Sequence, residues 1–280
     1  VAGEIYFAPS YSGNPLVNAM CVGILEKGKF LSARASGAGN PLLLVGADTG
    51  RDGIHGASGL ASRTFEEERE LRPTVQVGNP FLEKLLMEAC LELAGSPWVV
   101  GLSDLGAAGL TSAAVEAAAR GGCGVEIDVL KVSRREEGMT PYEVMLSESQ
   151  ERMLVVVEKG FEDRVKAIFD KWDLHSDIIG QVTGDGLARI KEGDRVVAEV
   201  PVSELTEPPV YRLKVVKPVY LEGLQNFDLN SLPDLPLPAS QALLRLLASP
   251  NIASKELVYR QYDHQVLTNT VVGPGGGDAA

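Results

Sequence analysis

Between residues 41 and 200, short apolar runs of strand length alternate with amphipathic helical segments. The run at 41–46 (PLLLVG) is almost entirely apolar, as expected of a strand buried on both faces of a sheet. Similar runs at 98–102 and 153–157 predict two further buried strands. Because strands and helices interleave along one stretch of chain, the pattern predicts an α/β or α+β domain.

The clearest helix is predicted over residues 80–94. Asn79 is a favourable N-cap, Pro80 suits the first helical position, and Gly95 follows as a stop signal. Apolar residues recur at helical spacing on one face, which we expect to be buried. They are Phe81, Leu82, Leu85, Leu86, Ala89, Cys90 and Leu93.

Three further elements are predicted downstream of this helix. An Ala-rich helix reaches about Arg120, and an amphipathic helix covers 161–172. The segment 181–200 is typical of a hairpin, with turn signals at 185–186 (DG) and 192–193 (EG).

The two ends of the chain differ from the middle. Apolar runs at 4–7 and 17–25 predict strands within residues 1–32. After residue 201, recurring prolines indicate a linker with one short helix at 241–247, and 257–280 are expected to open another domain with strands. The chain starts without Met, on an apolar run, which suggests a piece of a longer protein.

Composition excludes some classes of function. With 26 basic and 38 acidic residues the formal net charge is −12, which disfavours nucleic acid as a partner. No stretch approaches the roughly 20 apolar residues of a membrane helix, and the start lacks the features of a signal peptide. Three separated cysteines without a CxxC pair indicate neither a disulfide framework nor a zinc site, which fits a cytoplasmic protein. Cys90 is interpreted as a small buried hydrophobe.

The Gly-rich segment 49–59 is a candidate ligand loop. Its glycines permit close backbone approach, as in phosphate cradles, but it has neither Walker nor dinucleotide-binding spacing. The spacing alone favours a structural loop. His55 within it has two interpretations, a hydrogen-bonded structural residue or a catalytic base.

Two single residues are further candidates. Gln76 lies shortly before the predicted helix start, where its amide could face a cleft, although a solvated side chain is the commoner case. Asp104 follows a buried strand, where a carboxylate is well placed to bind Mg²⁺. The small residues behind it would let a helix N-terminus approach an anion. The alternative is that Asp104 merely caps the next helix.

A dense polar run precedes the strand at residue 153. It comprises Glu143 and the segment 147–152 (SESQER). These side chains could hold a ribose phosphate or an amide. From the residues alone, a solvated charged turn is the favoured interpretation.

Together these segments resemble phosphoribosylformylglycinamidine synthase, in order and in spacing, over essentially the whole chain. The motifs that carry the resemblance are 13–20 (GNPLVNAM), 49–57 (TGRDGIHGA), 73–78 (PTVQVG), 104–111 (DLGAAGLT), 145–153 (MLSESQERM) and 259–264 (YRQYDH). Ala8 is a small departure from the pattern and touches no site.

The resemblance implies a PurM-like architecture with two similar halves, each built from a barrel-forming α/β domain and a second α/β domain. Residues 1–38 would end the first N-terminal domain, and 39–207 would form a complete C-terminal domain. Residues 208–256 would be the Pro-rich linker, and 257–280 would begin the second half. The small form of the enzyme, with separate glutaminase and adaptor subunits, is the better match.

The reaction implied is ATP-dependent conversion of formylglycinamide ribonucleotide to the amidine with glutamine-derived ammonia. Carried over by position, Gln76, Glu148, Ser149 and Gln150 resemble substrate-binding residues, and Asp104 resembles one Mg²⁺ ligand. The family's catalytic His is expected upstream of Val1, so no residue here, His55 included, is assigned that role. The chain alone is expected to be inactive.

Two alternatives remain open at this point. One is another ATP-dependent enzyme of the same superfamily, such as aminoimidazole ribonucleotide synthase, although those relatives lack the contexts of Gln76 and 148–150. The other is a non-catalytic interaction module.

Overall fold

The computed structural model describes part of the chain in detail. The described residues are 5–13, 15–18, 20, 22–27, 30–54, 76–207, 209–234, 236–261, 265, 269–274 and 276. The chain divides into two compact units, Ile24–Tyr211 and a second unit made of Val1–Gly23 with Arg212–Ala280. No helix among the described residues has both the length and the apolar character needed to cross a membrane.

The unit Ile24–Tyr211 is built on a 7-stranded mixed sheet. Its order is β2-β4-β1-β5-β3-β6-β7, and every neighbouring pair is antiparallel except β3 with β6. The strands are β1 (Pro41–Gly46), β2 (Val99–Asp104), β3 (Gly124–Asp128), β4 (Arg152–Val157), β5 (His175–Thr183), β6 (Leu187–Glu192) and β7 (Arg195–Pro201).

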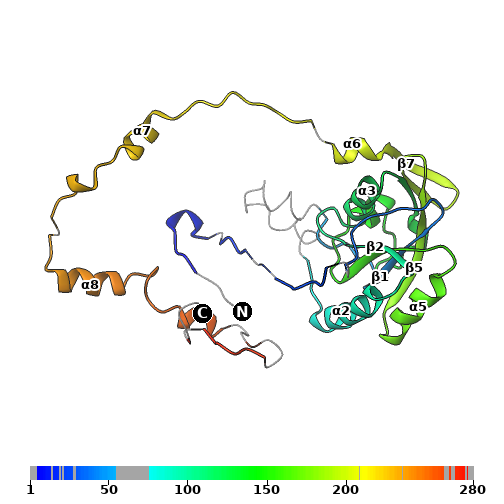
Figure 1. Ribbon diagram of the computed structural model, residues 1–280, viewed down its shortest axis with the longest axis horizontal. Helices are drawn as coiled ribbons and strands as arrows, with labels where there is room; N and C mark the ends of the chain where they lie inside the picture. Colours follow the sequence, from blue (N-terminus) through cyan, green and yellow to red (C-terminus); the bar gives the residue numbers. More distant parts are fainter. Residues whose placement is uncertain are drawn as a thin grey trace. The chain divides into compact units, whose positions relative to one another are not determined.

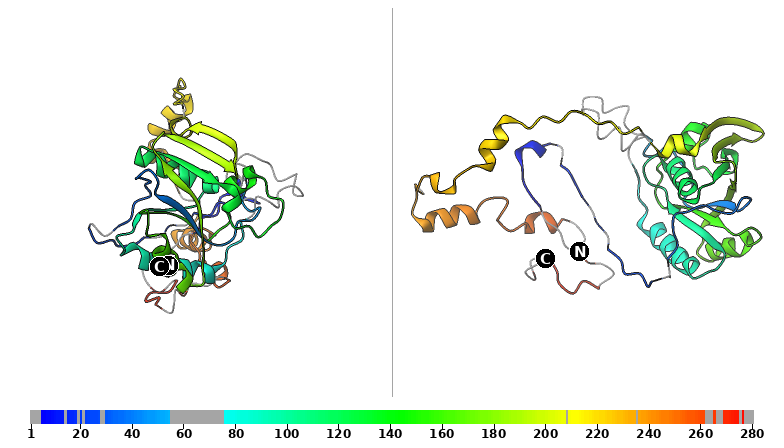
Figure 2. Two further views of the ribbon diagram at one scale, coloured as in Figure 1. Left: turned by 90° about the vertical axis from the view of Figure 1, so that its right-hand side faces the viewer. Right: turned by 45° about the horizontal axis from the view of Figure 1, so that its top comes forward.

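Helices cover both faces of this sheet (Figures 1 and 2). They are α2 (Pro80–Ala94), α3 (Gly109–Gly121), α4 (Pro141–Leu146), α5 (Glu162–Lys171) and α6 (Val202–Thr206), with the 3₁₀ turn η4 (Val129–Lys131). Two hydrophobic cores result, one with α3 and α4 and the other with α2 and α5. The predicted α/β class is confirmed.

Strand β1 shows how the two cores share one sheet. Every residue of β1 is buried, as the apolar run predicted. Leu42 and Leu44 enter the core with α3, whereas Leu43 and Val45 enter the core with α2 and α5. Side chains alternate between faces along a strand, so a strand covered on both sides must be apolar at every position.

Helix α2 has the predicted bounds, Pro80–Ala94. The Asn79 side chain caps it by accepting a hydrogen bond from the Leu82 N–H. Leu86, Ala89 and Leu93 are buried, and Cys90 packs against them. One part of the prediction is wrong: Phe81 is 72% exposed, because it lies in the first turn, before the helix reaches the core.

The hairpin prediction for 181–200 is half correct. The turn at 192–193 does join β6 to β7 as a hairpin. The turn at 185–186 does not make one, because β3 lies between β5 and β6 and pairs with both. A turn signal specifies a local reversal of the chain, whereas pairing across it depends on which strands compete for the same edge.

The second unit contains short helices. They are the 3₁₀ turns η1 (Pro9–Tyr11) and η5 (Leu229–Ser231) and the helices α7 (Val219–Gln225), α8 (Ala239–Leu247) and α9 (Glu256–Tyr259). The linker therefore holds α7 in addition to the predicted helix, and α8 begins two residues earlier than predicted.

The strands predicted at 4–7, at 17–25 and in 257–280 are absent among the described residues. In the two N-terminal segments, large apolar side chains are exposed instead; Val17, for example, is 82% exposed. A strand forms where a neighbour pairs with its N–H and C=O groups, and no neighbouring strand is present among the described residues there.

The start of α3 places an unusual demand on the backbone. Gly109 has a φ of +54°, and a Cβ added there would lie 1.8 Å from the carbonyl oxygen of Ser147. Only glycine satisfies both constraints. This close approach brings the N-terminus of α3 against the polar segment before β4.

We therefore expect Gly109→Ala to destabilise the chain by about 3 kcal/mol, through strain and a displaced helix. Gly106→Ala is the matched control, because nothing lies within 4 Å of its Cβ position. Urea unfolding followed by the fluorescence of Trp98 and Trp172 measures both. Equal midpoints for the two variants would contradict the close-packing argument.

Candidate functional site

The candidate residues gather at one end of the sheet because of strand pairing. Strand β4 is antiparallel to both β1 and β2, with Gly46 opposite Arg152 and Asp104 opposite Met153. The ends of β1 and β2 therefore lie beside the start of β4. The loop after β1, the turn after β2 and the segment 147–151 consequently meet.

Glu148 is the centre of this cluster and is buried, with 4% of its surface exposed. Its Oε1 accepts a hydrogen bond from the Ala108 N–H at 3.0 Å, and its Oε2 accepts one from Gln76 Nε2 at 2.7 Å. The structure thus brings together Gln76 and Glu148, which lie 72 residues apart. A buried carboxylate requires such donors.

Gly53 permits this arrangement. Its φ is +61°, and a Cβ there would lie 2.5 Å from Cβ of Glu148 and 3.1 Å from Cγ of Gln76. The glycine lets the loop after β1 pack directly against the buried carboxylate. The described part of that loop, residues 49–54, thus has packing contacts within the fold, and the preference for a structural over a ligand loop stays a prediction. His55 and the remainder of the Gly-rich segment lie outside the described residues.

The side chain of Ser149 points into the protein. It is 1% exposed, accepts a hydrogen bond from the Gly50 N–H at 2.9 Å and donates one to Asp52 Oδ2. Gln150 is partly buried, and its Nε2 donates to the Glu148 carbonyl at 3.0 Å. The segment 147–150 is therefore a fixed turn, and its interpretation as a solvated turn is wrong, because the loop after β1 covers it.

The Arg152 side chain links the loop after β1 to the segment before β4. Its guanidinium is buried and donates to Thr49 Oγ1 at 2.9 Å, to the Ser147 carbonyl at 2.7 Å and to the Ser149 carbonyl at 2.9 Å. Burial lowers the pKa of this guanidinium to about 10, while the nearby charge of Asp52 acts in the opposite direction. The side chain remains a cation at neutral pH.

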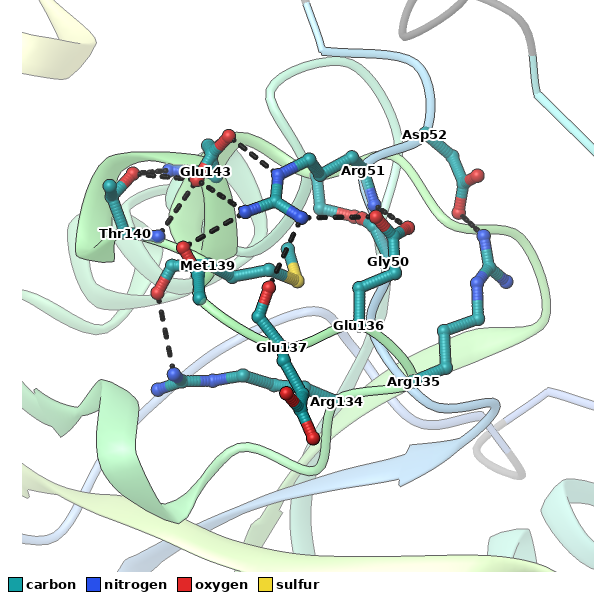
Figure 3. A network of polar contacts seen from close by, with 12 residues as sticks. Gly50, Arg51, Asp52, Arg134, Arg135, Glu136, Glu137, Met139, Thr140 and Glu143 are labelled. Atoms are coloured by element: carbon teal, nitrogen blue, oxygen red, sulfur yellow. Dashed lines mark hydrogen bonds and ion pairs between the residues drawn. The ribbon is translucent and has the colours of Figure 1, made fainter.

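A second ionic network fixes the outer side of the same loop (Figure 3). Arg51 Nε donates to Glu143 Oε1 at 2.8 Å, and Arg51 Nη1 donates to Glu136 Oε2 at 3.1 Å. Glu143 also forms a capping box with Thr140 at the start of α4. The bond from Arg51 and then the Thr140 N–H lower the pKa of Glu143 to about 2. Glu143 thus supports the loop from α4.

Asp104 lies at the end of β2, exposed, and among the described residues its carboxylate has no hydrogen-bond or ion-pair partner. It does not cap α3: the N-cap is Ala108, which has no side-chain cap. The capping interpretation of Asp104 is therefore wrong.

Asp104 and Gln150 line one cavity of about 530 Å³. Its apolar wall comes largely from α2, through Leu86, Met87, Cys90, Leu91 and Ala94. Burial raises the pKa of Cys90 to about 11, so its thiol is protonated and serves as a packing group, as expected. The cavity combines an apolar wall with a few polar groups, as ligand sites commonly do.

The described residues fit a shared Mg²⁺ site rather than a complete one. No group of three or more His, Cys, Asp or Glu side chains among them could enclose a metal ion. Protein-bound Mg²⁺ typically takes one or two carboxylates and fills its shell with water and substrate phosphates. The free carboxylate of Asp104 suits such a role as a single ligand.

Among the residues that fix this cluster, Arg135 lies outside every candidate segment of the sequence analysis, whereas Asp52 and Arg152 lie inside the segments 49–59 and 147–152 without an individual role assigned to them. Arg152 had a detectable signal, a charged residue directly before a run that predicts a buried strand. The partners of Asp52 and Arg135 lie about 80 to 100 residues away, and no local pattern reports them.

Residues 37–192 match the family model described as AIR synthase related protein, C-terminal domain. The chain belongs to the AIR synthase related protein family. The matched residues contain β1 to β6 and every candidate residue named above.

Relatives within this family are closely similar in sequence. The phosphoribosylformylglycinamidine synthase subunit PurL of Moorella thermoacetica is 57% identical over 100% of this chain. That of Thermomicrobium roseum is 58% identical, also over 100% of the chain. The resemblance inferred from the motifs is confirmed. The chain spans 38% of the length of each of these relatives.

Solved structures of the family agree with the fold. A structure of Thermotoga maritima PurL complexed with FGAR has a TM-score of 0.67 and 33% identity, covering 89% of this chain and 38% of that one. A structure of PurLQS from the same organism has a TM-score of 0.65 and 31% identity, covering 90% of this chain and 36% of that one.

The buried Arg152 leads to a first prediction about the site. Arg152→Lys removes the fork of donors and leaves buried carbonyl groups unpaired, so we expect a loss of about 3 kcal/mol in the free energy of unfolding. Arg195→Lys, at an exposed position of β7, is the control and should change little. Urea titration compares them. If Lys were tolerated equally at both positions, the anchoring role of Arg152 would be wrong.

The stabilisation from Glu143 should depend on pH. Its pKa is lowered from 4.5 to about 2 on folding, so its contribution is complete above about pH 4.5 and is lost as the pH falls toward 2. We expect the gap in urea midpoint between the wild type and Glu143→Gln to stay constant from neutral pH to about pH 4.5 and to shrink as the pH falls further toward 2. A gap that widens on acidification would contradict this assignment.

Proposed function

We propose that this chain is part of a phosphoribosylformylglycinamidine synthase and supplies one side of its substrate and Mg²⁺ site. One observation carries the proposal: Asp104 and Gln150 line the same cavity, in a chain 57% identical to a named subunit of that enzyme. The other candidates, Gln76 and Glu148, are hydrogen-bonded to each other, and Glu148 lies two residues before Gln150.

The proposed reaction converts the amide of formylglycinamide ribonucleotide to an amidine. ATP phosphorylates the amide oxygen, ammonia adds to the same carbon, and phosphate leaves with that oxygen. Phosphorylation is needed because an amide oxygen is a poor leaving group. Structures of Thermotoga maritima PurL complexed with ATP and with FGAR support ATP and this substrate as the ligands.

The substrate-binding set consists of Gln76, Glu148, Ser149 and Gln150. Gln150 lines the cavity and donates to the Glu148 backbone carbonyl, and the Gln76 amide donates to the Glu148 carboxylate. Ser149 takes part by fixing the turn that presents its neighbours, since its hydroxyl is committed to the loop after β1. No catalytic residue is assigned within the chain.

Asp104 would provide one oxygen ligand to Mg²⁺. When bound, the ion would neutralise the charge of the transferring phosphoryl group. Asp104 can serve this ion because its carboxylate is exposed at the cavity and has no bonding partner among the residues that the structure describes.

The domain assignment is also a proposal. Residues 39–207 form the C-terminal α/β domain of one half, which agrees with the compact unit Ile24–Tyr211 and with the family match over 37–192. Residues 1–38 end the preceding barrel-forming domain, 208–256 are the linker, and 257–280 begin the second half.

A glutaminase subunit and a small adaptor subunit are the proposed protein partners. They would deliver ammonia from glutamine. The similarity to the structure of PurLQS from Thermotoga maritima, which covers 90% of this chain, supports such an assembly.

Substitution of Asp104 tests the metal assignment in the full-length protein. We expect Asp104→Asn to lower ATP- and formylglycinamide ribonucleotide-dependent phosphate release by at least about 10-fold and to raise the Mg²⁺ concentration needed for half-maximal rate. The control is Asp163→Asn, an exposed carboxylate in the first turn of α5. Phosphate release against Mg²⁺ concentration is the measurement. A wild-type rate and Mg²⁺ dependence for Asp104→Asn would remove Asp104 from the metal site.

A further inference from the structure

The loop after β1 and the turn before β4 are joined by reciprocal hydrogen bonds. The Glu148 N–H donates to the Asp52 carbonyl at 2.8 Å, and the Gly50 N–H donates to Ser149 Oγ at 2.9 Å. In return, Ser147 Oγ donates to the Gly50 carbonyl at 2.6 Å. The position of the proposed substrate-binding turn is therefore set by Gly50 and Asp52.

The Asp52 carboxylate closes this arrangement. Its Oδ2 accepts hydrogen bonds from both Ser149 Oγ and Arg135 Nη2. Asp52 is 8% exposed, so its charge requires a cation, and Arg135 is its ion-pair partner. Ser149 thus receives its orientation from a carboxylate that Arg135 in turn holds.

Arg135 is itself fixed by the same loop. Its N–H donates to the Thr49 carbonyl at 3.0 Å, and the adjacent Arg134 forms a β-bridge with Thr49. Its guanidinium lies over Gly50, where an added Cβ would come within 2.3 Å of Nε. These contacts limit Arg135 to the direction in which it meets Asp52.

Arg51, between Gly50 and Asp52 in the sequence, points the other way. Figure 3 shows its guanidinium directed to Glu136 and Glu143, while the Asp52 side chain is directed to Arg135. The loop therefore has two separate ionic anchors. One stabilises it against α4, and the other reaches the turn at 147–150.

We propose that Asp52 and Arg135 are positioning residues for the substrate amide-binding turn, acting through Ser149 on Glu148 and Gln150. This rests on the proposed function, since it assigns a task to residues behind that site. Neither residue is proposed to touch the substrate. Their effect is to hold in one orientation the turn that carries Glu148 and Gln150, of which Gln150 lines the cavity.

The expected signature is selective for one substrate. Without the Asp52 carboxylate, the Ser149 hydroxyl loses its acceptor and the turn gains freedom, which weakens binding of formylglycinamide ribonucleotide. Asp104 lies on β2 and has no bond to Asp52 among the described residues, so the dependence on ATP and Mg²⁺ should stay unchanged. A merely structural defect would not separate the two substrates.

The test compares four variants of the full-length protein: Asp52→Ala, Arg135→Met, Arg135→Lys and Arg51→Ala. We expect Asp52→Ala to raise KM for formylglycinamide ribonucleotide about 10-fold and Arg135→Met about 5-fold, with KM for ATP changed less than about twofold. Arg135→Lys keeps the charge and should recover most of the loss. Arg51→Ala is the matched control, expected to lower Tm without changing either KM.

Arg135→Met keeps the test decisive if Asp52→Ala does not fold, because the Arg135 side chain is 42% exposed. The proposal is wrong if Arg135→Met leaves KM for formylglycinamide ribonucleotide unchanged, if both substrates are affected equally, or if Arg51→Ala gives the same shift. Failure of the proposed function is distinguishable: the wild-type protein would then neither bind formylglycinamide ribonucleotide in calorimetry nor release phosphate with it.

Discussion

The buried guanidinium of Arg152 is the interaction on which the architecture of the site depends. It stands at the first position of β4, where that strand pairs with β1, and its donors reach Thr49, Ser147 and Ser149. A buried cation is costly unless hydrogen bonds and a counter-charge surround it. The polar segment 147–151 and the loop with Asp52 provide these, and so the cation determines where both segments lie.

Two layers of polar contacts follow from that anchor. The inner layer, centred on Ser149 and Asp52, holds the turn that carries Glu148 and Gln150. The outer layer, centred on Arg51, ties the same loop to α4 through Glu143. Asp104 belongs to neither layer, and within the described part of the chain its carboxylate at the cavity has no partner. The site thus combines a turn that hydrogen bonds hold in place with the exposed carboxylate of Asp104. Such a carboxylate suits a metal ion whose other ligands come from elsewhere.

The candidate site could be anticipated only in part. Motif resemblance pointed to Gln76, Asp104 and the segment 148–150, which the structure brings to one end of the sheet. The residue types alone favoured a solvent-exposed turn at 147–152, because a dense run of charged side chains ordinarily lies in solvent. Burial of Glu148 and Ser149 depends on partners about 40 to 100 residues distant, which neither propensity nor periodicity can report.

The sequence by itself determined the local elements, such as α2 between its Asn79 cap and Gly95, and β1 as a doubly buried strand. These follow from capping, proline geometry and the spacing of apolar residues, all of which act within a few positions of the chain. Tertiary structure alone decided that β3 separates β5 from β6 and that the polar run before β4 is interior. Strand order and polar burial are settled by competition between distant segments for the same edges and donors, and that competition exists only in the folded chain.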